Sequence, residues 1–530
     1  MSGPRISEIK QPFANDTVNL ALDTIGLKKQ ALFFVGSKRG AEKCAEDIAL
    51  KIQHTDATLE SIAESIIHAI AKPTRQCERL ARCVNKSIAF HHSGLTAGQR
   101  DIIEDNFKSG KIKIICCTPT LAAGVDLPAF RAVIRDLKRY SSTGWGGMQY
   151  IPVLEYLQMA GRAGRPKFDT VGETICIAAT EQEKENIRER YIKGVPEDIY
   201  SKLAVEPVLR TYLLSLIATD FVRSRKEIVQ FFAKTFWAHQ FRDMPKLESI
   251  IDKVLDLLER YEFITMKQKS GDFISADELK EEKEHLIRPT MLGRRVAQLY
   301  IDPLTAHHLI KRIRRSTERM VSPFGILQMV CNTLEMRPLL RVKTKEFEKF
   351  NEQYAKFESD ILQKEPSIYE AEYDDFLASV KTAFFMYDWI GEKDEEFLYT
   401  EYDIRPGETR VKIDKADWLL YSCEEIAKLM SFHDVLKHIS KVRFRLRYGV
   451  KEELIPLLKL SGIGRVRARK LHNSGIKDIG SVKRADVTSL AQLVGKATAL
   501  SIKKQVGEDI EQAVVPDGKR KGQLSLGKYT

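Results

Sequence analysis

The sequence predicts an α/β domain built on a parallel sheet, followed by domains that are mainly helical. Apolar strand-like runs alternate with helical spacing over residues 1–195, and helical spacing dominates from residue 196 onward. A chain of 530 residues is also too long for one hydrophobic core, which predicts several domains. With 43% hydrophobic and 30% charged residues, no long apolar run and no signal-like start, the sequence predicts a cytoplasmic protein without a membrane partner.

Five short runs have the composition of strands in the predicted sheet. They are ALFFV (31–35), SIAF (87–90), KIKIICCTP (111–119), AVIRDL (132–137) and ETICIA (173–178). The third is continuous enough to lie in a sheet that is buried on both faces. Because helical segments separate these runs, we expect parallel strands with ligands at their carboxyl ends.

Residues 196–302 predict a winged helix. Ser224 and Glu227 form a capping box at the start of a helix, and PKLESIIDKVLDLLERYEFI is an amphipathic helix that ends in a short strand. TMKQKSGDFISADE then predicts a hairpin, or wing. Winged helices bind DNA or serve as structural packing, and both roles are open here. Residues 303–440 predict an all-helical domain.

Residues 441–512 predict a helix-hairpin-helix domain. In LIPLLKLSGIGRVRARKL a helix, the turn Gly462 to Gly464 and a second helix follow one another. Glycine amides at a helix N-terminus bind a phosphate without reading bases. Three arginines follow the turn, namely Arg465, Arg467 and Arg469. A weaker second copy is predicted at 490–502; the alternative is a plain helical turn with exposed arginines.

The positive charge is concentrated at the C-terminal end of the chain. Residues 441–530 hold 20 Lys and Arg against 8 Asp and Glu, an excess equal to the whole net charge of +12. This distribution predicts a polyanionic partner that is gripped by the C-terminal region. The alternative is a basic, solvated solubility tail, and residues 513–530 are predicted to be a flexible basic tail.

The eight cysteines form no CxxC pair, and several fall in apolar runs. This pattern predicts reduced buried thiols and no metal site.

The segment QMAGRAGRP (158–166) predicts an anion clamp. On a helix, Gln158, Arg162 and Arg165 would project from one face at i, i+4 and i+7. Two arginines on one face suit the phosphates of a nucleotide. Upstream, TPTLAAGVDLPA (118–129) predicts a loop at the carboxyl edge of the sheet. In it Asp126 would accept a hydrogen bond from a ribose hydroxyl or link the nucleotide to the clamp helix.

Four segments together resemble known motifs. FFVGSKRGAEK (33–43), AFHHSGL (89–95), TPTLAAGVDLPA and QMAGRAGRP resemble motifs IV, IVa, V and VI of superfamily 2 helicases, in that order. The details resemble the Ski-type branch, and within it the archaeal DNA-repair helicases akin to the helicase region of DNA polymerase theta.

The resemblance implies an order of domains and an activity. The order is a second RecA-like motor domain (1–195), a winged helix (196–302), a helical ratchet domain (303–440) and a helix-hairpin-helix (441–512). The implied activity is ATP-dependent 3′-to-5′ DNA helicase or translocase action in repair or replication restart, on single-stranded or forked DNA at the chromosome.

The resemblance also implies roles around the nucleotide. Arg162 and Arg165 would be arginine fingers that stabilise charge on the γ-phosphate, with Gln158 beside them. Gly124 and Asp126 would couple the nucleotide state to the DNA strand.

A second group would face DNA within the motor domain. Thr118, His91 and His92 would lie on the side of the DNA backbone; the alternative for the histidines is that they are satisfied polar residues at a strand end. Trp145 or Tyr150, in the place of the strand-separating hairpin, would wedge against the junction base pair. The alternative there is a glycine-rich loop with a stray Trp.

In the ratchet and helix-hairpin-helix domains the resemblance implies a grip on the translocating strand. Trp418 matches a Trp that stacks on bases, although a Trp at helical spacing is also typical of a core. The expected Arg two turns earlier is replaced by Val411, with Arg410 and Lys412 on either side. Arg465, Arg467 and Arg469, preceded by Gly462 and Gly464, would hold the emerging strand.

Two helicase motifs are absent from the sequence. It contains no GxxxxGK[ST] and no DExH box, so the phosphate cradle and the magnesium carboxylate are missing. We therefore expect ATP and Mg²⁺ to be used only when a separate first motor domain is supplied. A fragment, a truncated gene product, half of a split enzyme and a non-catalytic DNA-binding protein are all open; an RNA helicase fits the helix-hairpin-helix less well.

The tail GKRKGQLSLGKYT suggests a further partner. Gln523, Leu526 and Tyr529 follow the spacing of peptides that dock on sliding clamps, but Thr530 stands where a second aromatic residue is expected. The alternative is a disordered polar end.

Overall fold

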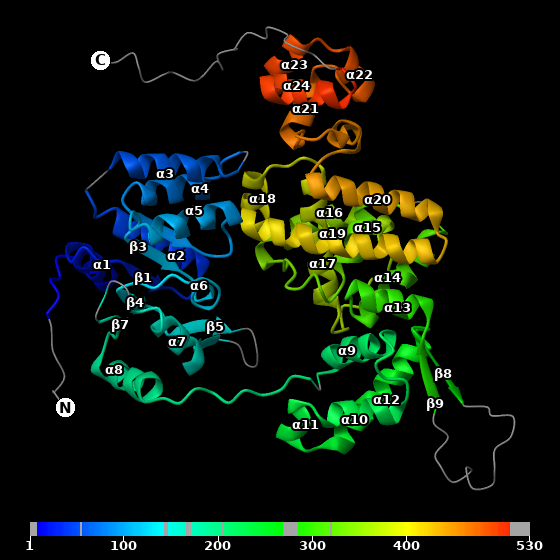
Figure 1. Cartoon of the computed structure of the whole chain (residues 1–530), viewed down its shortest axis with the longest axis horizontal. Helices are drawn as coiled ribbons and strands as arrows, with labels where there is room; N and C mark the ends of the chain where they lie inside the picture. Colours follow the sequence, from blue (N-terminus) through cyan, green and yellow to red (C-terminus); the bar gives the residue numbers. More distant parts are fainter. Residues whose placement is uncertain are drawn as a thin grey trace. The chain divides into compact units, whose positions relative to one another are not determined.

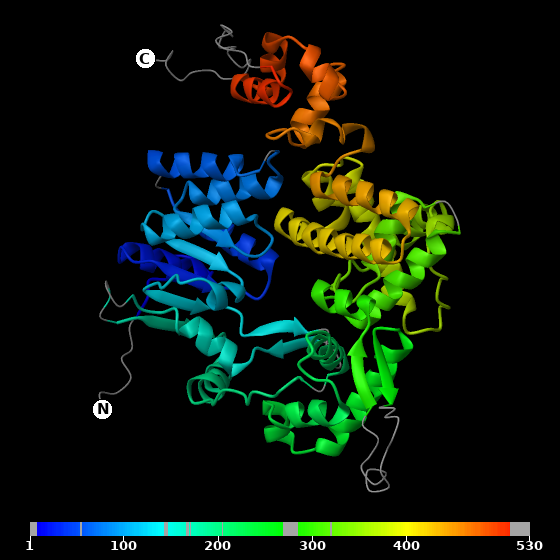
Figure 2. The same cartoon turned by 45° about the vertical axis from the view of Figure 1, so that its right-hand side comes forward.

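The computed structural model describes residues 8–53, 56–70, 72–141, 147–165, 169, 171–203, 205–268, 285–318 and 321–508. Its contacts divide the chain into two compact units. The first comprises Met1–Ile199 and Asp394–Val411, and the second comprises Tyr200–Lys393 and Lys412–Thr530. Figures 1 and 2 show the elements of both units, coloured along the sequence.

The first unit contains a five-stranded sheet in the order β2-β3-β1-β4-β7. Every neighbouring pair of strands in it is parallel. The strands are β1 (Ala31–Phe34), β2 (Ile88–His91), β3 (Ile114–Cys117), β4 (Arg131–Ile134) and β7 (Glu173–Cys176). The five predicted strands and their parallel arrangement are thus confirmed. All residues of β1 to β4 are buried, as expected for a sheet covered on both faces.

Helices surround this sheet, with α2 against β2 and β3, α4 and α5 against β2, and α7 against β4. Figure 1 shows these helices in blue and cyan around the strands. The helices of this part are α1 (Asp16–Gly26), α2 (Lys38–Ala49), α3 (Ala57–His68), α4 (Arg75–Val84), α5 (Ala97–Lys108), α6 (Thr120–Gly124), α7 (Val153–Ala160), α8 (Glu181–Ile187) and the π-helix η1 (Arg188–Ile192). Local capping fixes several of their starts: the Ser37 hydroxyl accepts from Gly40 N at 3.0 Å, and Thr96 and Gln99 form a capping box.

An antiparallel hairpin extends from the sheet in the segment predicted for it. Its strands are β5 (Lys138–Ser141) and β6 (Gly147–Tyr150). Trp145 lies outside the described residues. The hairpin is therefore present, while the role of its tip stays a prediction.

The first unit also includes a segment that the sequence assigns to the ratchet domain. Asp394–Val411 contains α18 (Glu395–Tyr402) and the first turns of α19 (Pro406–Leu429). The predicted all-helical character of this region is confirmed, and its assignment to a domain at 303–440 stays a prediction.

The second unit begins with the predicted winged helix. Its elements are α9 (Glu206–Ala218), α10 (Arg225–Ala233), α11 (Phe236–Phe241), α12 (Met244–Arg260), β8 (Ile264–Gln268), β9 (His285–Pro289) and α13 (Met291–Leu299). Strands β8 and β9 pair antiparallel as the wing, and the Ser224 hydroxyl accepts from Glu227 N at 3.3 Å. The buried Arg210 on α9 binds Asp302 with two hydrogen bonds of 2.8 and 2.9 Å, which ties this domain to the next helix.

The helical domain follows, as predicted. Its helices in the second unit are α14 (Pro303–Ser316), α15 (Pro323–Cys331), η3 (Thr344–Glu346), α16 (Phe347–Ala355), η4 (Glu358–Asp360), α17 (Tyr373–Ile390), the remainder of α19 and α20 (His433–Tyr448). Helix α15 packs against α17 and α20 through side chains that are almost all buried.

The C-terminal domain is a tandem of helical hairpins with its own core. It contains η5 (Glu452–Leu454), η6 (Leu457–Lys459), α21 (Arg465–Asn473), α22 (Ile479–Arg484), α23 (Val487–Val494) and α24 (Lys496–Gln505). The first predicted helix is wrong in detail, because LIPLLKL forms 3₁₀ turns on either side of Pro456, which has no N–H to donate. The second copy is confirmed, with Gly495 at φ +90° between α23 and α24.

All eight cysteines are free thiols, and seven of them are buried. Burial raises the pKa of the Cys176 thiol to about 11 and that of Cys331 to about 12. The thiols therefore serve as small core side chains.

Candidate nucleotide and nucleic-acid interface

The predicted clamp helix ends before its arginines. Helix α7 stops at Ala160, Gly161 caps it, and Gly164 adopts φ +94°. A Cβ on the neighbouring Gly172 would lie 2.4 Å from Gly164 N, so two glycines allow the chain to turn tightly here. The prediction that Gln158, Arg162 and Arg165 share one helix face is therefore wrong. Gln158 is exposed on α7, and both arginines lie on the loop that follows it.

Arg162 is held against the loop after β3. Its guanidinium donates from Nε to Ala122 O at 3.0 Å, and a second nitrogen donates to the same carbonyl. A third nitrogen lies 3.7 Å from a carboxylate oxygen of Asp126, whose side chain is 96% exposed. Gly124 ends α6 in the same loop and is exposed. Arg162 is thus oriented mainly by a neutral carbonyl, which leaves its charge available to an outside anion.

Backbone contacts join the two loops that carry these residues. Ala129 N donates to Arg162 O at 2.9 Å, and Gly164 N donates to Ala129 O at 2.7 Å. The loops that resemble motifs V and VI therefore form one rigid edge, although 40 residues separate Ala122 from Arg162.

Arg165 has a different environment. Its guanidinium binds Asp169 at 2.6 and 3.2 Å and Gln30 Oε1 at 2.8 Å. Lys29 Nζ also lies 2.6 Å from Asp169, whose carboxylate is 1% exposed. Hydrogen bonds from Arg165 and Lys29 outweigh burial and lower the pKa of Asp169 to about 2. The charge of Arg165 is therefore largely compensated within the protein.

The side chains of His91 and His92 are buried and paired with carboxylates. His91 Nε2 lies 2.9 Å from Glu104, and His92 Nε2 lies 3.2 Å from Glu42. Burial lowers the pKa of both rings against the pull of these carboxylates. One nitrogen of each ring, His91 Nδ1 and His92 Nε2, is buried without a hydrogen-bond partner among the described residues. The predicted place of both histidines beside the DNA backbone stays a prediction. Thr118 is also buried, with its hydroxyl 2.8 Å from that of Thr120.

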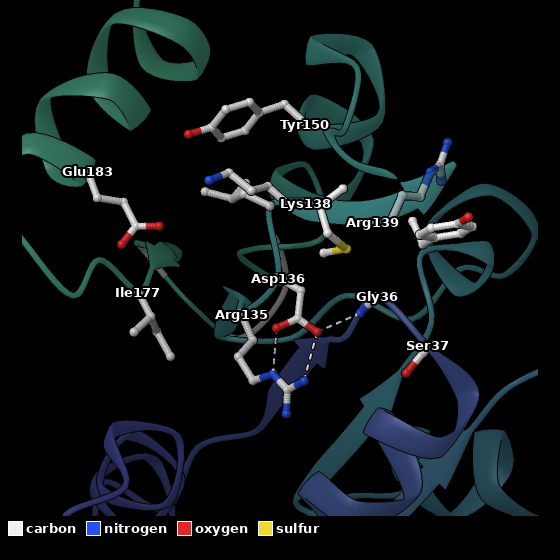
Figure 3. Close-up of a pocket in the computed structure, with 12 residues that line it drawn as sticks. Gly36, Ser37, Arg135, Asp136, Lys138, Arg139, Tyr150, Ile177 and Glu183 are labelled. Atoms are coloured by element: carbon white, nitrogen blue, oxygen red, sulfur yellow. Dashed lines mark hydrogen bonds and ion pairs between the residues drawn. The ribbon is translucent and has the colours of Figure 1, made fainter. Parts of the chain in front are cut away.

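A hollow of about 560 Å³ lies at the base of the hairpin (Figure 3). Asp136 stands in its floor, where it binds Arg135 through two hydrogen bonds and accepts from Gly36 N at 2.9 Å. Lys138 and Arg139 also line it. Glu183 also lines the hollow, so side chains of both charges lie beside the carboxyl ends of β1 and β4.

Tyr150 lies between two cations. Lys138 Nζ is 4.6 Å from its ring centroid, and the guanidinium carbon of Arg190 is 4.7 Å from it. A ring already in contact with two cations is held in place. The Tyr150 side chain is half-buried. Its predicted contact with a base pair would therefore be made by the exposed part of the ring.

Trp418 is half-buried on α19, and its indole N–H donates to Leu299 O at 3.0 Å. The edge of the indole is therefore fixed by the end of α13. Arg410 and Val411 are exposed, and Lys412 Nζ donates to Pro338 O at 2.6 Å.

The three arginines of the helix-hairpin-helix differ in their partners. Arg469 binds Glu392 at 2.5 and 2.7 Å and Glu453 at 2.9 Å. Arg465 donates to Lys393 O at 2.6 Å and lies over the Trp389 ring, 4.9 Å from its centroid.

Arg467 is exposed and donates to Gly462 O at 2.8 Å. Gly462, at φ +83°, and Gly464, at the start of α21, are also exposed. Arg467 and the two glycines therefore form the accessible part of the predicted phosphate site, while Arg465 and Arg469 dock the domain.

Two functional features escaped the sequence. Glu42 and Arg405, which are 363 residues apart in the sequence, form a buried ion pair at 3.0 Å. Glu392 forms an ion pair with Arg469. Each residue looks like an ordinary surface charge in its own segment, so no local signal could have found these pairs. The peptide of Gln523, Leu526 and Tyr529 lies outside the described residues.

Four known domain families match the chain in order. Residues 18–167 match the helicase conserved C-terminal domain, and 172–265 match a helix-turn-helix domain. Residues 324–449 match domain 4 of archaeal helicases, and 454–508 match a SAM-like helix-hairpin-helix tandem. Together these matches reproduce the predicted succession of domains.

Several full-length relatives are similar to nearly the whole chain. The ATP-dependent DNA helicase Hel308 of Pyrococcus horikoshii is 38% identical over 518 residues, which cover 96% of this chain and 68% of the relative. The Hel308 proteins of Methanococcus vannielii and Methanocella arvoryzae are 35% and 36% identical, over 92% and 96% of this chain and 67% of each relative. The chain thus spans about two thirds of the length of these relatives.

The parallel sheet, the joined motif loops and the domains that follow define a superfamily 2 helicase of the Ski-type branch. The matched relatives specify which one: the chain belongs to the archaeal Hel308 helicase family.

Proposed function

We propose that this chain supplies the second motor domain and the DNA-handling domains of an ATP-dependent 3′-to-5′ DNA helicase that acts in repair or replication restart. The observation that carries the proposal is the position of Arg162. Its guanidinium is oriented by Ala122 O at 3.0 Å and lies beside the exposed Asp126, at the carboxyl edge of the sheet. A preset arginine at this edge suits a finger that stabilises a transferring phosphate.

ATP hydrolysis requires a partner domain in this proposal. The sequence contains neither GxxxxGK[ST] nor a DExH box, which supply the phosphate cradle and the magnesium ligand. ATP and Mg²⁺ would therefore bind only when a first motor domain faces Arg162. Gln158 and Gly124 would lie along that nucleotide edge, and Arg165 would stiffen the loop through Asp169.

DNA would be handled by separate parts of the chain. The hairpin and the hollow at its base would meet the duplex junction, and Trp418 would stack on bases of the single strand. The amides of Gly462 and Gly464, with Arg467, would bind backbone phosphates of the emerging strand. These contacts are largely independent of sequence, as a motor that moves along DNA requires.

The cellular setting follows from the same proposal. No helix in the described part of the chain is long and apolar enough to cross a membrane. We place the protein in the cytoplasm on the chromosome, with single-stranded or forked DNA as its substrate. A sliding clamp that binds the peptide around Gln523, Leu526 and Tyr529 is a further proposed partner.

The test is ATP turnover with and without single-stranded DNA. The 530-residue chain alone is expected to stay at background. Turnover is expected to rise when a first motor domain that carries GxxxxGK[ST] and a DExH box is added or fused. Hydrolysis by the chain alone would contradict the claim that half of the site is missing. If the completed protein binds DNA but hydrolyses no ATP, the exposed helix-hairpin-helix site would favour the second candidate, a non-catalytic DNA-binding protein.

A further inference from the structure

The hairpin of β5 and β6 can separate base pairs only if its base is rigid. Its strands pair over a short register, from Lys138 opposite Tyr150 to Ser141 opposite Gly147. A two-stranded hairpin is at best marginally stable by itself. The side chain of Met148 on β6 is 65% exposed, so the sheet of the α/β domain does not cover it. The contacts at the base therefore decide how firmly the hairpin is held.

The π-helix η1 lies against the base of this hairpin. It follows α8, packs against α7, and closes with a hydrogen bond of 3.0 Å from Lys193 N to Arg188 O. Turns of this kind are rare and frequently occur at functional sites. Its consecutive residues Arg190 and Tyr191 both contact the hairpin; Arg190 is exposed, whereas Tyr191 is almost completely buried. The π-helix thus supplies one contact from the surface and one from the core.

Tyr191 binds the residues at which the chain enters and leaves the hairpin. Leu137 and Ile151 flank the two strands, and Ile151 N donates to Leu137 O at 3.0 Å. The Tyr191 hydroxyl donates to Ile151 O at 2.8 Å and lies 3.5 Å from Leu137 O. Burial raises the pKa of Tyr191 to about 12, so this donor keeps its proton near neutral pH. The Tyr191 ring packs on Tyr156 of α7, with the ring centroids 4.9 Å apart, and this packing fixes the position of the hydroxyl.

A second contact holds the hairpin from the surface. The guanidinium carbon of Arg190 lies 4.7 Å from the centroid of the Tyr150 ring, and Lys138 Nζ lies 4.6 Å from the same centroid (Figure 3). A cation over an aromatic ring is attracted by the electron density of its face. Glu197, which follows the π-helix, accepts hydrogen bonds of 2.6 and 3.1 Å from the first two amides of α7. All of these residues belong to the first unit.

We propose that η1 is a clamp that fixes the hairpin against the duplex, and that Arg190 and Tyr191 are positioning residues for strand separation. This inference rests on the proposed helicase function. A hairpin that bends when a duplex presses on it takes up the work of the motor in its own movement. A hairpin that is held at both ends delivers this work to the base pair at the junction. The clamp therefore matters most where the base pairs are strongest.

The first arm of the test uses the 530-residue chain alone. Tyr191→Phe removes the hydroxyl and keeps the packed ring, and Arg190→Gln removes the cation on the surface. Arg188→Gln is the matched control, because Arg188 lies on the same π-helix and forms an exposed ion pair of 4.0 Å with a residue of α8. Amide hydrogen exchange of residues 147–151 is expected to accelerate about tenfold in Tyr191→Phe and about threefold in Arg190→Gln, but not in the control or in β1. Unchanged exchange of residues 147–151 in both variants, or an equal acceleration in β1, would overturn the clamp.

The second arm uses the helicase completed with a first motor domain and compares two activities. ATP turnover on single-stranded DNA requires no opened base pair, whereas strand separation on a forked duplex does. In Tyr191→Phe and Arg190→Gln we expect ATP turnover within about twofold of wild type. Base pairs separated per ATP are expected to fall about threefold on an A·T-rich fork and about tenfold on a G·C-rich fork. Arg190→Lys, which keeps a cation over the Tyr150 ring, is expected to restore most of this ratio.

The two activities also decide against the proposal. An equal fall of turnover and strand separation, or a deficit that is independent of base composition, would mean that Arg190 and Tyr191 only stabilise the domain. Either result would overturn their role in strand separation. A completed wild type that hydrolyses no ATP would overturn the proposed function and this role with it, while the exchange arm still decides whether η1 holds the hairpin.

Discussion

The loop after α7 and the turn before α21 both combine glycines with arginines, but the arginines differ in how far their charge is available to an anion. Each contains arginines after glycines, in GRAGR and GIGRVRAR, and each is predicted from sequence to grip phosphates. In both, one arginine is held by backbone carbonyl groups and another by carboxylates: Arg162 and Arg467 belong to the first kind, Arg165 and Arg469 to the second. A carbonyl orients a guanidinium without cancelling its charge, whereas a carboxylate does both. Each cluster thus contains an arginine that can serve a ligand and an arginine that builds the site. Arg465 also donates to a carbonyl, but it lies over the Trp389 ring and belongs to the docking contact.

The largest expected effect separates the two arginines of the α7 loop. In the completed helicase, Arg162→Ala is expected to lower ATP turnover about 1000-fold, because it removes the charge aimed at the phosphate. Its melting temperature should change little. Arg165→Ala is expected to destabilise the α/β unit by about 2 kcal/mol, since it leaves the buried Asp169 with Lys29 alone. Turnover assays and thermal unfolding of both variants check this; a stable Arg165→Ala with an unfolded Arg162→Ala would reverse the comparison.

The strands, the wing and the two arginine clusters could be predicted from the sequence. Which arginine of each cluster is paired with a carboxylate could not. Strand-like runs, the wing and the long helices were predictable because their signals are local. The end of α7 at Ala160 was missed because the helical spacing of the polar residues 158, 162 and 165 does not show where the helix stops. Gly161 and the left-handed Gly164 turn the chain away. The pairing of Arg165 with Asp169 and of Arg469 with Glu392 depends on tertiary contacts, which no spacing rule encodes.

Trp418 is an aromatic side chain that is also held by a carbonyl, because its indole N–H donates to Leu299 O. Part of its ring stays exposed and is accessible to a base. Trp418→Ala is expected to lower the affinity of the chain for single-stranded DNA about tenfold, as the loss of one stacked base predicts. Trp418→Phe keeps a ring and should stay within about threefold, at a stability cost of about 1 kcal/mol for the lost hydrogen bond. Fluorescence anisotropy and thermal unfolding measure both; wild-type affinity in Trp418→Ala would identify the residue as core only.

A smaller effect is expected from the helix-hairpin-helix arginines. Arg467→Gln should weaken single-strand binding about fivefold and reduce the salt dependence of binding by about one phosphate contact. Arg469→Gln should leave the salt dependence unchanged, because Glu392 and Glu453 already compensate this charge. It should instead accelerate amide exchange around α21, where the domain docks. If the DNA affinities of the two variants depended equally on salt concentration, Arg467 and Arg469 would not differ in their contact with phosphate.

The smallest effect concerns the carboxylate that compensates Arg165. The pKa of Asp169 is about 2 in the folded chain, below its ordinary value of 3.8. A depressed carboxyl pKa adds stability that is fully present above pH 3.8 and is lost as the pH falls through about 2. Asp169→Asn lacks this contribution, so its deficit in stability, less than about 2 kcal/mol, should be constant near neutral pH and shrink as the pH approaches 2. Thermal unfolding of both proteins across this range checks the sign. A deficit independent of pH would show that Asp169 acts through packing, and Arg165 would then keep more of its charge for a ligand than the geometry indicates.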